Sequence, residues 1–354
     1  MISSDRKNRL QRKLDHLQLY REGWGKRSNG FEDIYLVHQA LPEIDLGEID
    51  VSCRWLGKTL AAPFIINAMT GGTPASMAIN SSLARAAART GIAMAVGSQR
   101  IALEDPEAQA SFGIVRRENP SGIILANVSA GTSPAEARQA VEMIAADGLQ
   151  VHLNVLQELL MPEGDRYFRH YRQRIAEVVT VVQVPVIAKE VGSGLSREAA
   201  LALYGCQVRH IDVGGCGGTN FAAIETKRAG VEKEDYCYWG LPTAVSVAEV
   251  FSSGLPVEII ASGGISSPVE AAKALALGAS LVGVAGHFLK ILVEKGEESL
   301  IAEIEMWKQE LKHICLMCGA RSLAELRRVP VIITGRTYEW LVNRGIDPGR
   351  FARR

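Results

Sequence analysis

The 354-residue sequence contains little that would direct the protein to a membrane, to an oxidising compartment or to a polyanion. Its first residues lack the apolar core of a signal peptide, and no later run approaches the roughly 18 apolar residues that a membrane-spanning helix needs. Lys plus Arg and Asp plus Glu each number 39, so the formal net charge is +0. Neither nucleic acid nor an acidic membrane is therefore expected to bind, and a cytoplasmic location is predicted.

The sequence also lacks paired cysteines of the kind that build a disulfide framework. Six cysteines are scattered along the chain, which is typical of reduced thiols. Cys315 and Cys318 form one Cys-x-x-Cys sequence with His313 nearby, but no second pair accompanies them. Within a helical pattern, this spacing favours two buried core thiols over a zinc site.

What the sequence does contain is an alternation of short apolar runs and helical stretches, with apolar residues making up 47% of the whole. Strands alternating with helices predict parallel pairing with right-handed crossovers, and eight such units close into a barrel. We therefore expect an α/β fold, a TIM (β/α)8 barrel. The predicted strands are 64–68, 93–96, 123–127, 151–154, 186–190, 210–213, 258–262 and 280–284.

The barrel is predicted to occupy residues 63–295 of a single domain. Residues 1–62 would form an N-terminal arm and cap, in which runs 31–38 and 49–53 pair as a hairpin over the barrel base. Residues 296–354 would form a C-terminal helical extension packed on the barrel. The long interval after the sixth strand, 214–242, exceeds a bare connector and predicts an active-site loop.

Two consecutive strands near the end of the barrel run directly into turns of small residues. Segments 257–265 and 280–286 each pass from a β-branched run into Gly, Ser or Ala and then into a helical pattern. Small residues let backbone N–H groups approach a phosphate, and a helix N-terminus adds partial positive charge. The loops after the seventh and eighth strands of such barrels often hold a phosphate, so a phosphate site is predicted here.

Polar residues gather at the carboxyl ends of the predicted strands, where barrels place their chemistry. Burying such groups is costly unless they pair with one another or with a ligand. The alternation in the fourth strand sends His152 and Asn154 to one side. The other segments with this character are 67–72, 97–100, 127–129, 189–190 and 212–220.

Lys189 and the pair Gln157 and Glu158 have specific chemical interpretations. A cation facing the barrel interior suits a flavin, whose reduced ring carries negative charge at its N1/O2 edge. A salt bridge from Lys189 to Asp212 or Glu190, or a Schiff-base lysine, are the alternatives. Gln157 offers an amide to a substrate, and a single carboxylate at Glu158 suits Mg²⁺ when phosphates and water complete the coordination. The alternative for Glu158 is an exposed residue at a helix start.

These residues resemble type 2 isopentenyl-diphosphate isomerase in order and approximate spacing, over nearly the whole chain. The most specific part is the His-Leu-Asn-x-x-Gln-Glu sequence of 152–158. The resemblance implies an FMN enzyme that interconverts isopentenyl and dimethylallyl diphosphate with Mg²⁺, with NADPH keeping the flavin reduced and no net redox change. It also implies a homotetramer or homo-octamer. The remaining matching segments are Arg12, Lys13 and His16, then 68–72, 97–100, 189–190, 217–219 and 261–264.

The resemblance also implies roles for individual residues. Gln157, His152 and Asn154 would be catalytic, with the latter two steadying the diphosphate, and Glu158 would hold Mg²⁺. Substrate would be bound by Arg12, Lys13, Ser98, Gln99, Arg100 and Gln157. FMN would be held by Ala68, Met69, Thr70, Ser98, Asn127, Lys189, Thr219, Gly263, Gly264, Ile265, Ala285 and Gly286.

This chain departs from the family pattern at two places. Asn220 and Phe221 stand where Ser-Trp is usual, and Ser266 stands where an Arg is common, which leaves a bound phosphate with one charge fewer. An FMN-dependent 2-hydroxy-acid oxidase is the alternative enzyme, but His287 has no neighbouring Arg to hold a carboxylate. A non-catalytic flavin or phosphate carrier is the alternative from another class.

Overall fold

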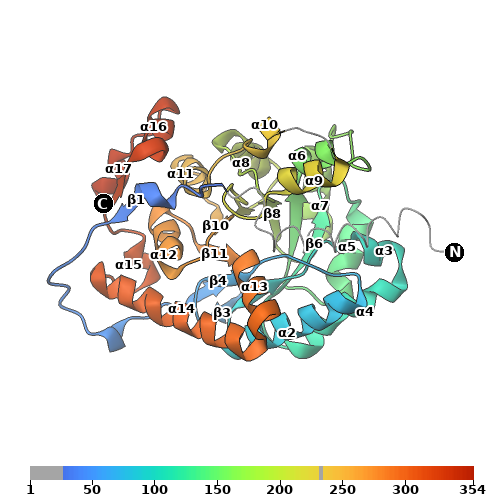
Figure 1. The fold of residues 1–354 in the computed structure, drawn as a ribbon, viewed down its shortest axis with the longest axis horizontal. Helices are drawn as coiled ribbons and strands as arrows, with labels where there is room; N and C mark the ends of the chain where they lie inside the picture. Colours follow the sequence, from blue (N-terminus) through green and yellow to red (C-terminus); the bar gives the residue numbers. More distant parts are fainter. Residues whose placement is uncertain (1–26, 231–233) are drawn as a thin grey trace.

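The computed structural model describes residues 27–230 and 234–354, and a closed parallel barrel lies at its centre (Figure 1). Neighbouring strands pair in parallel throughout, and the last strand pairs with the first through Val282 and Phe64. The predicted TIM barrel is confirmed. Its strands are β4 (Phe64–Ile66), β5 (Ala93–Ala95), β6 (Ile124–Ser129), β7 (Gly148–Leu153), β8 (Val186–Glu190), β9 (His210–Asp212), β10 (Glu258–Ser262) and β11 (Leu281–Val284).

Helices surround the barrel, and their starts carry the signals expected of a helix N-terminus. Thr73 and Ser133 each cap a helix through a reciprocal capping box, with a proline directly after each cap. One helix lacks such a side-chain cap: it begins at Tyr171, directly after His170, which has a φ of 72°. The helices between barrel strands are α2 (Pro74–Thr90), α3 (Arg100–Glu104), α4 (Pro106–Glu118), α5 (Pro134–Met143), α6 (Val155–Leu160), α7 (Tyr171–Val181), α8 (Arg197–Gly205), α9 (Phe221–Ala229), α10 (Glu234–Cys237), α11 (Thr243–Ser252) and α12 (Pro268–Leu277).

The predicted hairpin between 31–38 and 49–53 is wrong in its pairing. Strand β1 (Ile34–Leu36) instead pairs antiparallel with β12 (Val331–Ile333) near the other end of the chain. The hairpin at the barrel base is formed by β2 (Cys53–Trp55) and β3 (Lys58–Leu60). Its two-residue turn takes positive φ at both positions, which is the twist that tight hairpins favour.

This hairpin closes the amino-terminal end of the barrel with apolar side chains. Trp55 and Leu60 are buried in one cluster with residues of the barrel strands, such as Ile65 and Leu125. Lys58 forms an ion pair with Asp147, which directly precedes β7, with 2.6 Å between Nζ and Oδ1. The base is therefore sealed, so a ligand cavity in the barrel has to open at the opposite end.

The C-terminal extension packs against the outside of the barrel. After α13 (Gly286–Lys295), the long helix α14 (Glu297–Met317) contacts α2, α12 and α13 and runs along one side of the molecule in Figure 1. Trp307 is fully buried there and packs edge-on against Phe64. The extension ends in α15 (Leu323–Leu326), α16 (Gly335–Asn343) and α17 (Gly349–Ala352).

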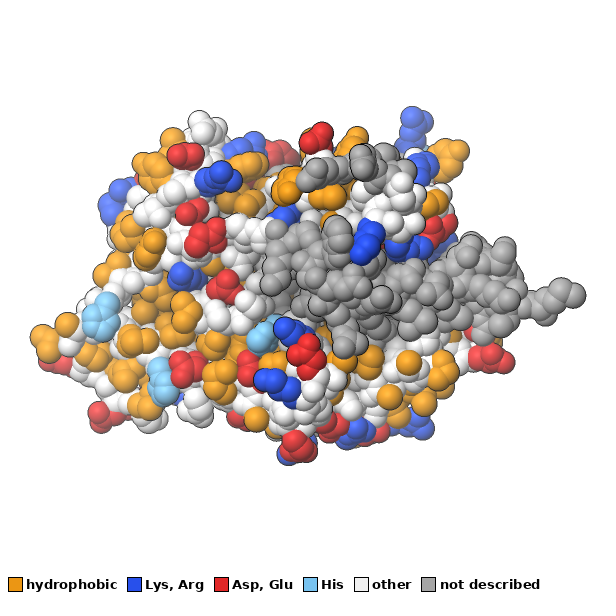
Figure 2. Space-filling model, viewed as in Figure 1, with side chains coloured by type: hydrophobic (Ala, Val, Ile, Leu, Met, Phe, Trp, Pro, Cys, Tyr) orange, Lys and Arg blue, Asp and Glu red, His pale blue; other side chains and the backbone are white. Residues whose placement is uncertain are grey.

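Three further features relate to the predictions from sequence: the two thiols of the Cys-x-x-Cys sequence, the helices of the described ranges, and the distribution of surface charge. Cys315 and Cys318 are buried around the end of α14, and burial raises the pKa of Cys315 to about 12. Across the described ranges, no helix combines the length and apolarity needed to cross a membrane. On the face shown in Figure 2, the described acidic and basic side chains are intermixed. This matches the balanced charge of the sequence.

Candidate active site

A cavity of about 1020 Å³ lies at the carboxyl ends of the barrel strands. Each of the eight strands, or the loop that follows it, contributes residues to the lining. The volume reaches the upper end of the roughly 300–1,000 Å³ that small-molecule sites occupy. The cavity therefore has room for a large cofactor, a substrate or both.

Glycine-rich loops form one wall of this cavity. Gly263 and Gly264 have φ values of 114° and 78°, and a Cβ added to Gly264 would lie 2.3 Å from the carbonyl carbon of Gly217. Only glycine allows the loops after β9 and β10 to approach this closely. Ala285 and Gly286 lead into α13 beside them, so a helix N-terminus faces the same wall. These are the backbone features that a phosphate requires.

Ser266, the position of one departure from the family pattern, is already engaged by a carboxylate. Its backbone N–H donates to Glu270 Oε2 at 2.8 Å, and its hydroxyl donates to the same oxygen at 3.3 Å. Lys290, one turn into α13, is a cation that lines the cavity near Gly286. Lys290 is thus a basic group available to this wall.

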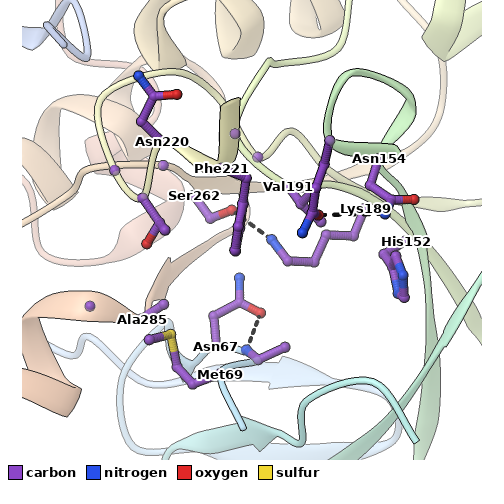
Figure 3. Close-up of a pocket in the computed structure, with 18 of the residues that line it drawn as sticks. Asn67, Met69, His152, Asn154, Lys189, Val191, Asn220, Phe221, Ser262 and Ala285 are labelled. Atoms are coloured by element: carbon purple, nitrogen blue, oxygen red, sulfur yellow. Dashed lines mark hydrogen bonds between the residues drawn. The ribbon is translucent and has the colours of Figure 1, made fainter. Parts of the chain in front are cut away.

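Lys189 projects from the end of β8 toward the centre of the cavity (Figure 3). Its Nζ lies 3.1 Å from Asp212 Oδ2 and donates to Ser262 Oγ at 3.2 Å. The expected alternative, a salt bridge to Asp212, is therefore present. The ammonium nevertheless lines the cavity, so the carboxylate fixes the cation in place without enclosing it.

Glu190, next to Lys189, turns away to cap the following loop. Its Oε2 accepts backbone N–H groups of Gly192, Ser193 and Gly194. Burial raises the pKa of Glu190 to about 7, although these hydrogen bonds and Lys189 favour the ionised form. Burial likewise raises the pKa of the Cys216 thiol to about 11, which disfavours a thiolate in the loop after β9.

The end of β7 places four polar residues on the cavity wall. Asn154 starts α6, so Gln157 and Glu158, three and four residues on, share its face of the helix. Asn154 Nδ2 donates to Glu158 Oε1 at 2.7 Å, and the Asp165 N–H donates to Glu158 Oε2 at 2.7 Å. Figure 3 shows His152 and Asn154 on the same flank of the cavity.

The side chains near Glu158 determine whether this wall of the cavity could bind a metal ion. In the part of the chain that the structure describes, no group of three His, Cys, Asp or Glu side chains could enclose a metal ion. A cation at Glu158 would depend on ligand oxygens and water. That is the usual way in which Mg²⁺ binds beside phosphates, and an ionised carboxylate has further lone pairs to offer. The residues present therefore fit Mg²⁺ bound together with a diphosphate.

Most of the predicted site residues line this one cavity, but Gln99 does not. Gln99 is fully buried, with its Nε2 donating to Ala140 O at 2.9 Å and its Oε1 accepting the Asn127 N–H at 2.9 Å. Gln99 therefore lies apart from the lining residues and supports the end of β6, and its expected substrate contact stays a prediction. Arg12, Lys13 and His16 lie outside the described residues. Those that line the cavity are Ala68, Met69, Thr70, Ser98, Arg100, Asn127, His152, Asn154, Gln157, Glu158, Lys189, Thr219, Gly263, Gly264, Ile265, Ala285 and Gly286.

Sequence reasoning missed two polar residues that support these groups, Gln150 and Glu225. Gln150 is buried inside the barrel and hydrogen-bonded to Asn67, which belongs to the predicted strand-end segment 67–72. Gln150, His152 and Asn154 alternate along one strand, and this period could have revealed Gln150. Glu225 on α9 is fully buried and accepts from Gln157 Nε2 at 3.4 Å. No local signal pointed to Glu225, because α9 lies in the long loop after β9.

A closed parallel barrel with two small-residue turns after its last two strands, and a fixed lysine beside them, is a (β/α)8 barrel with the backbone features of a phosphate site. The sequence model of the FMN-dependent dehydrogenase family matches residues 164–332. Among solved structures, a mandelate oxidase variant superposes with a TM-score of 0.64 at 16% identity, covering 90% of this chain and all of that one. Such a distant likeness supports the fold alone.

Curated relatives narrow the class further. An isopentenyl-diphosphate delta-isomerase from Moorella thermoacetica is 61% identical over 95% of this chain and 97% of its own length. One from Bacillus licheniformis is 48% identical over 96% of this chain and 98% of its own. The chain belongs to the isopentenyl-diphosphate delta-isomerase family.

Proposed function

We propose that the protein interconverts isopentenyl diphosphate and dimethylallyl diphosphate, a 1,3-allylic proton shift in isoprenoid biosynthesis. One observation carries this proposal. A single cavity brings together the glycine-rich turns, the fixed Lys189 ammonium and the polar end of β7 with His152, Gln157 and Glu158. The names of the curated relatives supply the substrate.

The cavity wall fits FMN. The turns at Gly263, Gly264 and Ile265 and at Ala285 and Gly286 would hold its phosphate. Its ring and ribityl chain would be held by Ala68, Met69, Thr70, Ser98, Asn127, Lys189 and Thr219. Reduced FMN would supply an electron-rich ring, able to stabilise positive charge, and an acid–base group. The Lys189 ammonium, fixed by Asp212, would stabilise negative charge on a ligand without having to reorient.

The other side of the cavity fits a diphosphate. His152, Asn154, Ser98 and Arg100 would contact it, with Arg12 and Lys13 proposed as further cations. Glu158, already oriented by Asn154 and the Asp165 N–H, would hold Mg²⁺ against the phosphate oxygens. Arg100 lies at the rim and is more than half exposed, which suits a first contact for an incoming anion.

Gln157 is proposed to act closest to the reacting carbons, with His152 and Asn154 completing the catalytic group. Its amide is restrained by Glu225, which is paired with Arg228. A carbon–carbon double bond is a poor base, so its protonation needs an acid held away from water. NADPH is proposed as the reductant that keeps the flavin reduced, and a homotetramer or homo-octamer as the assembly.

The test is turnover of the reduced, FMN-loaded protein with isopentenyl diphosphate and Mg²⁺ under anaerobic conditions in deuterated water. Deuterium-containing dimethylallyl diphosphate is the expected product. Bleaching of oxidised flavin by lactate or glycolate, with no isomer formed, would instead identify a 2-hydroxy-acid oxidase. FMN binding without either reaction would identify a carrier.

A further inference from the structure

Hydrogen bonds form a continuous chain inside the barrel from Asp212 on β9 to His152 on β7. Asn67 Nδ2 donates to Asp212 Oδ2 at 2.8 Å, and Gln150 Nε2 donates to Asn67 Oδ1 at 2.9 Å. Asn127 Nδ2 donates to Gln150 Oε1 at 3.0 Å, and Asn127 Oδ1 lies 2.8 Å from His152 Nδ1. Asp212 and Gln150 are fully buried, and Asn67 and Asn127 nearly so.

The Asp212 end of this chain determines the direction of every hydrogen bond in it. A carboxylate paired with an ammonium only accepts, so the Asn67 NH₂ group has to face Asp212. The Asn67 oxygen then faces Gln150 and needs its NH₂ group, and the Gln150 oxygen in turn needs the NH₂ group of Asn127. The Asn127 oxygen is left facing His152 Nδ1, which has to be the donor.

Reversing any amide of the chain would set two NH₂ groups or two oxygens against each other. Such a mismatch inside the barrel would leave buried polar groups without partners, since bulk water does not reach Gln150. The second oxygen of Asp212 does not offer a way out. It accepts from the Ser262 hydroxyl and from the Gly214 N–H.

We propose that this chain holds His152 with a hydrogen on Nδ1, and that Gln150 and Asn67 are positioning residues for it. In the neutral ring, Nε2 is then the atom without a hydrogen, and it donates a hydrogen bond to an anionic ligand only when a second proton makes the ring an imidazolium. Only the identification of that ligand as the diphosphate rests on the proposed function. The same carboxylate fixes Lys189 on one side and His152 on the other, so Asp212 is the common anchor of the cofactor side and the substrate side.

The direct test is nuclear magnetic resonance of the FMN-loaded protein with ¹⁵N-labelled histidine. The chain has seven histidines, and a His152→Gln variant identifies the signal of interest. With the pH raised until the ring is neutral, we expect a protonated Nδ1 and an unprotonated Nε2. A neutral ring protonated on Nε2 would overturn the proposal. This test does not require a substitution of Asp212, Asn67, Gln150 or Asn127, the residues that form the hydrogen-bond chain.

A Gln150→Met variant tests whether the hydrogen-bond chain is the cause of Nδ1 protonation in His152. Gln150 does not line the cavity, and methionine keeps its length while removing both hydrogen bonds. We expect a mixture of tautomers in the neutral His152 ring. At a pH where the ring is an imidazolium, binding of inorganic diphosphate should weaken by about tenfold, because Nδ1–H has lost a fixed acceptor, while FMN affinity is retained. Asn80→Leu is the matched control, since Asn80 is a buried amide outside the chain whose Nδ2 donates to Ser111 O at 2.8 Å.

A Gln150→Met protein with the wild-type tautomer and wild-type diphosphate affinity would refute the positioning role. Should that variant fail to fold, the wild-type spectrum still decides the tautomer. The proposal for the His152 tautomer and the proposal of isomerase activity can be refuted independently. An Nδ1-protonated His152 in a protein that forms no isomer would sink the isomerase proposal only.

Discussion

Replacing Lys189 by methionine separates the two roles that this side chain can have. Lys189 is nine-tenths buried against Asp212, whose side chain has no exposed surface. Removing the ammonium leaves a buried carboxylate with neutral donors only, and breaking such a pair typically costs about 3–5 kcal/mol of unfolding free energy. A charge-assisted hydrogen bond to the flavin would be lost as well, which is worth about 1.5–3 kcal/mol.

The double variant Lys189→Met with Asp212→Asn removes both charges. We expect it to regain most of the unfolding free energy, because no unpaired charge is left in the barrel. It should not regain FMN affinity, which we expect to fall by about tenfold to a hundredfold in both variants. Urea unfolding of the apoprotein measures the first quantity, and quenching of FMN fluorescence on titration measures the second.

The outcomes discriminate between the roles. Wild-type FMN affinity in Lys189→Met would refute the flavin role and leave a structural salt bridge. A double variant as unstable as Lys189→Met would refute the reasoning from an unpaired carboxylate.

Three further predictions follow from the site. Gln157→Ala and Glu158→Ala should each lower the isomerisation rate by at least about a hundredfold while the protein stays yellow, and full rates in both would refute the roles proposed for these two residues of α6. Gly264→Ala should lose FMN affinity and more than about 1 kcal/mol of stability, because its φ is 78° and its Cβ would strike Gly217, whereas Gly254→Ala, at a φ of 70° in open space, should retain FMN. Burial raises the pKa of Glu190 from 4.5 to about 7, so the folded state binds a proton more tightly than the unfolded chain, and stability should fall by about 3 kcal/mol as the pH rises through that window. Urea unfolding at a series of pH values should show this slope reduced in Glu190→Gln, and an unchanged slope would contradict it.

The barrel could be predicted from sequence because its strands are buried on both faces and therefore read as continuous apolar runs. The pairing of β1 with β12 could not, because three-residue strands joined by nearly 300 residues carry no local information about register. The base hairpin was hidden for another reason. Its turn starts with Leu56 at a φ of 45°, a position where Asn, Asp or Gly is the usual signal.

The candidate site, like the fold, could be predicted from the sequence only in part. Strand ends identified many of the residues that line the cavity, since a parallel barrel brings those ends together whatever its details. The orientation of a side chain there was not predictable. Gln99 follows its strand as Ser98 does, yet the chain turns into α3 at that point and the amide faces the helices outside the barrel. Gln150 was missed because the predicted strand began at 151, whereas β7 begins at Gly148, and no local feature identifies its partner Asn67, 83 positions away.

The antiparallel ladder of β1 and β12 has a mechanical consequence for the cavity. Just before β1, Asn29 donates to Gly264 O in the glycine-rich turn at 3.1 Å and to Glu270 at 2.8 Å. The segment that contacts this turn is therefore held in place by a strand from the last tenth of the polypeptide. Deleting the residues from Val331 onward should loosen this contact, and the proposed FMN affinity should fall although the eight barrel strands remain in the protein.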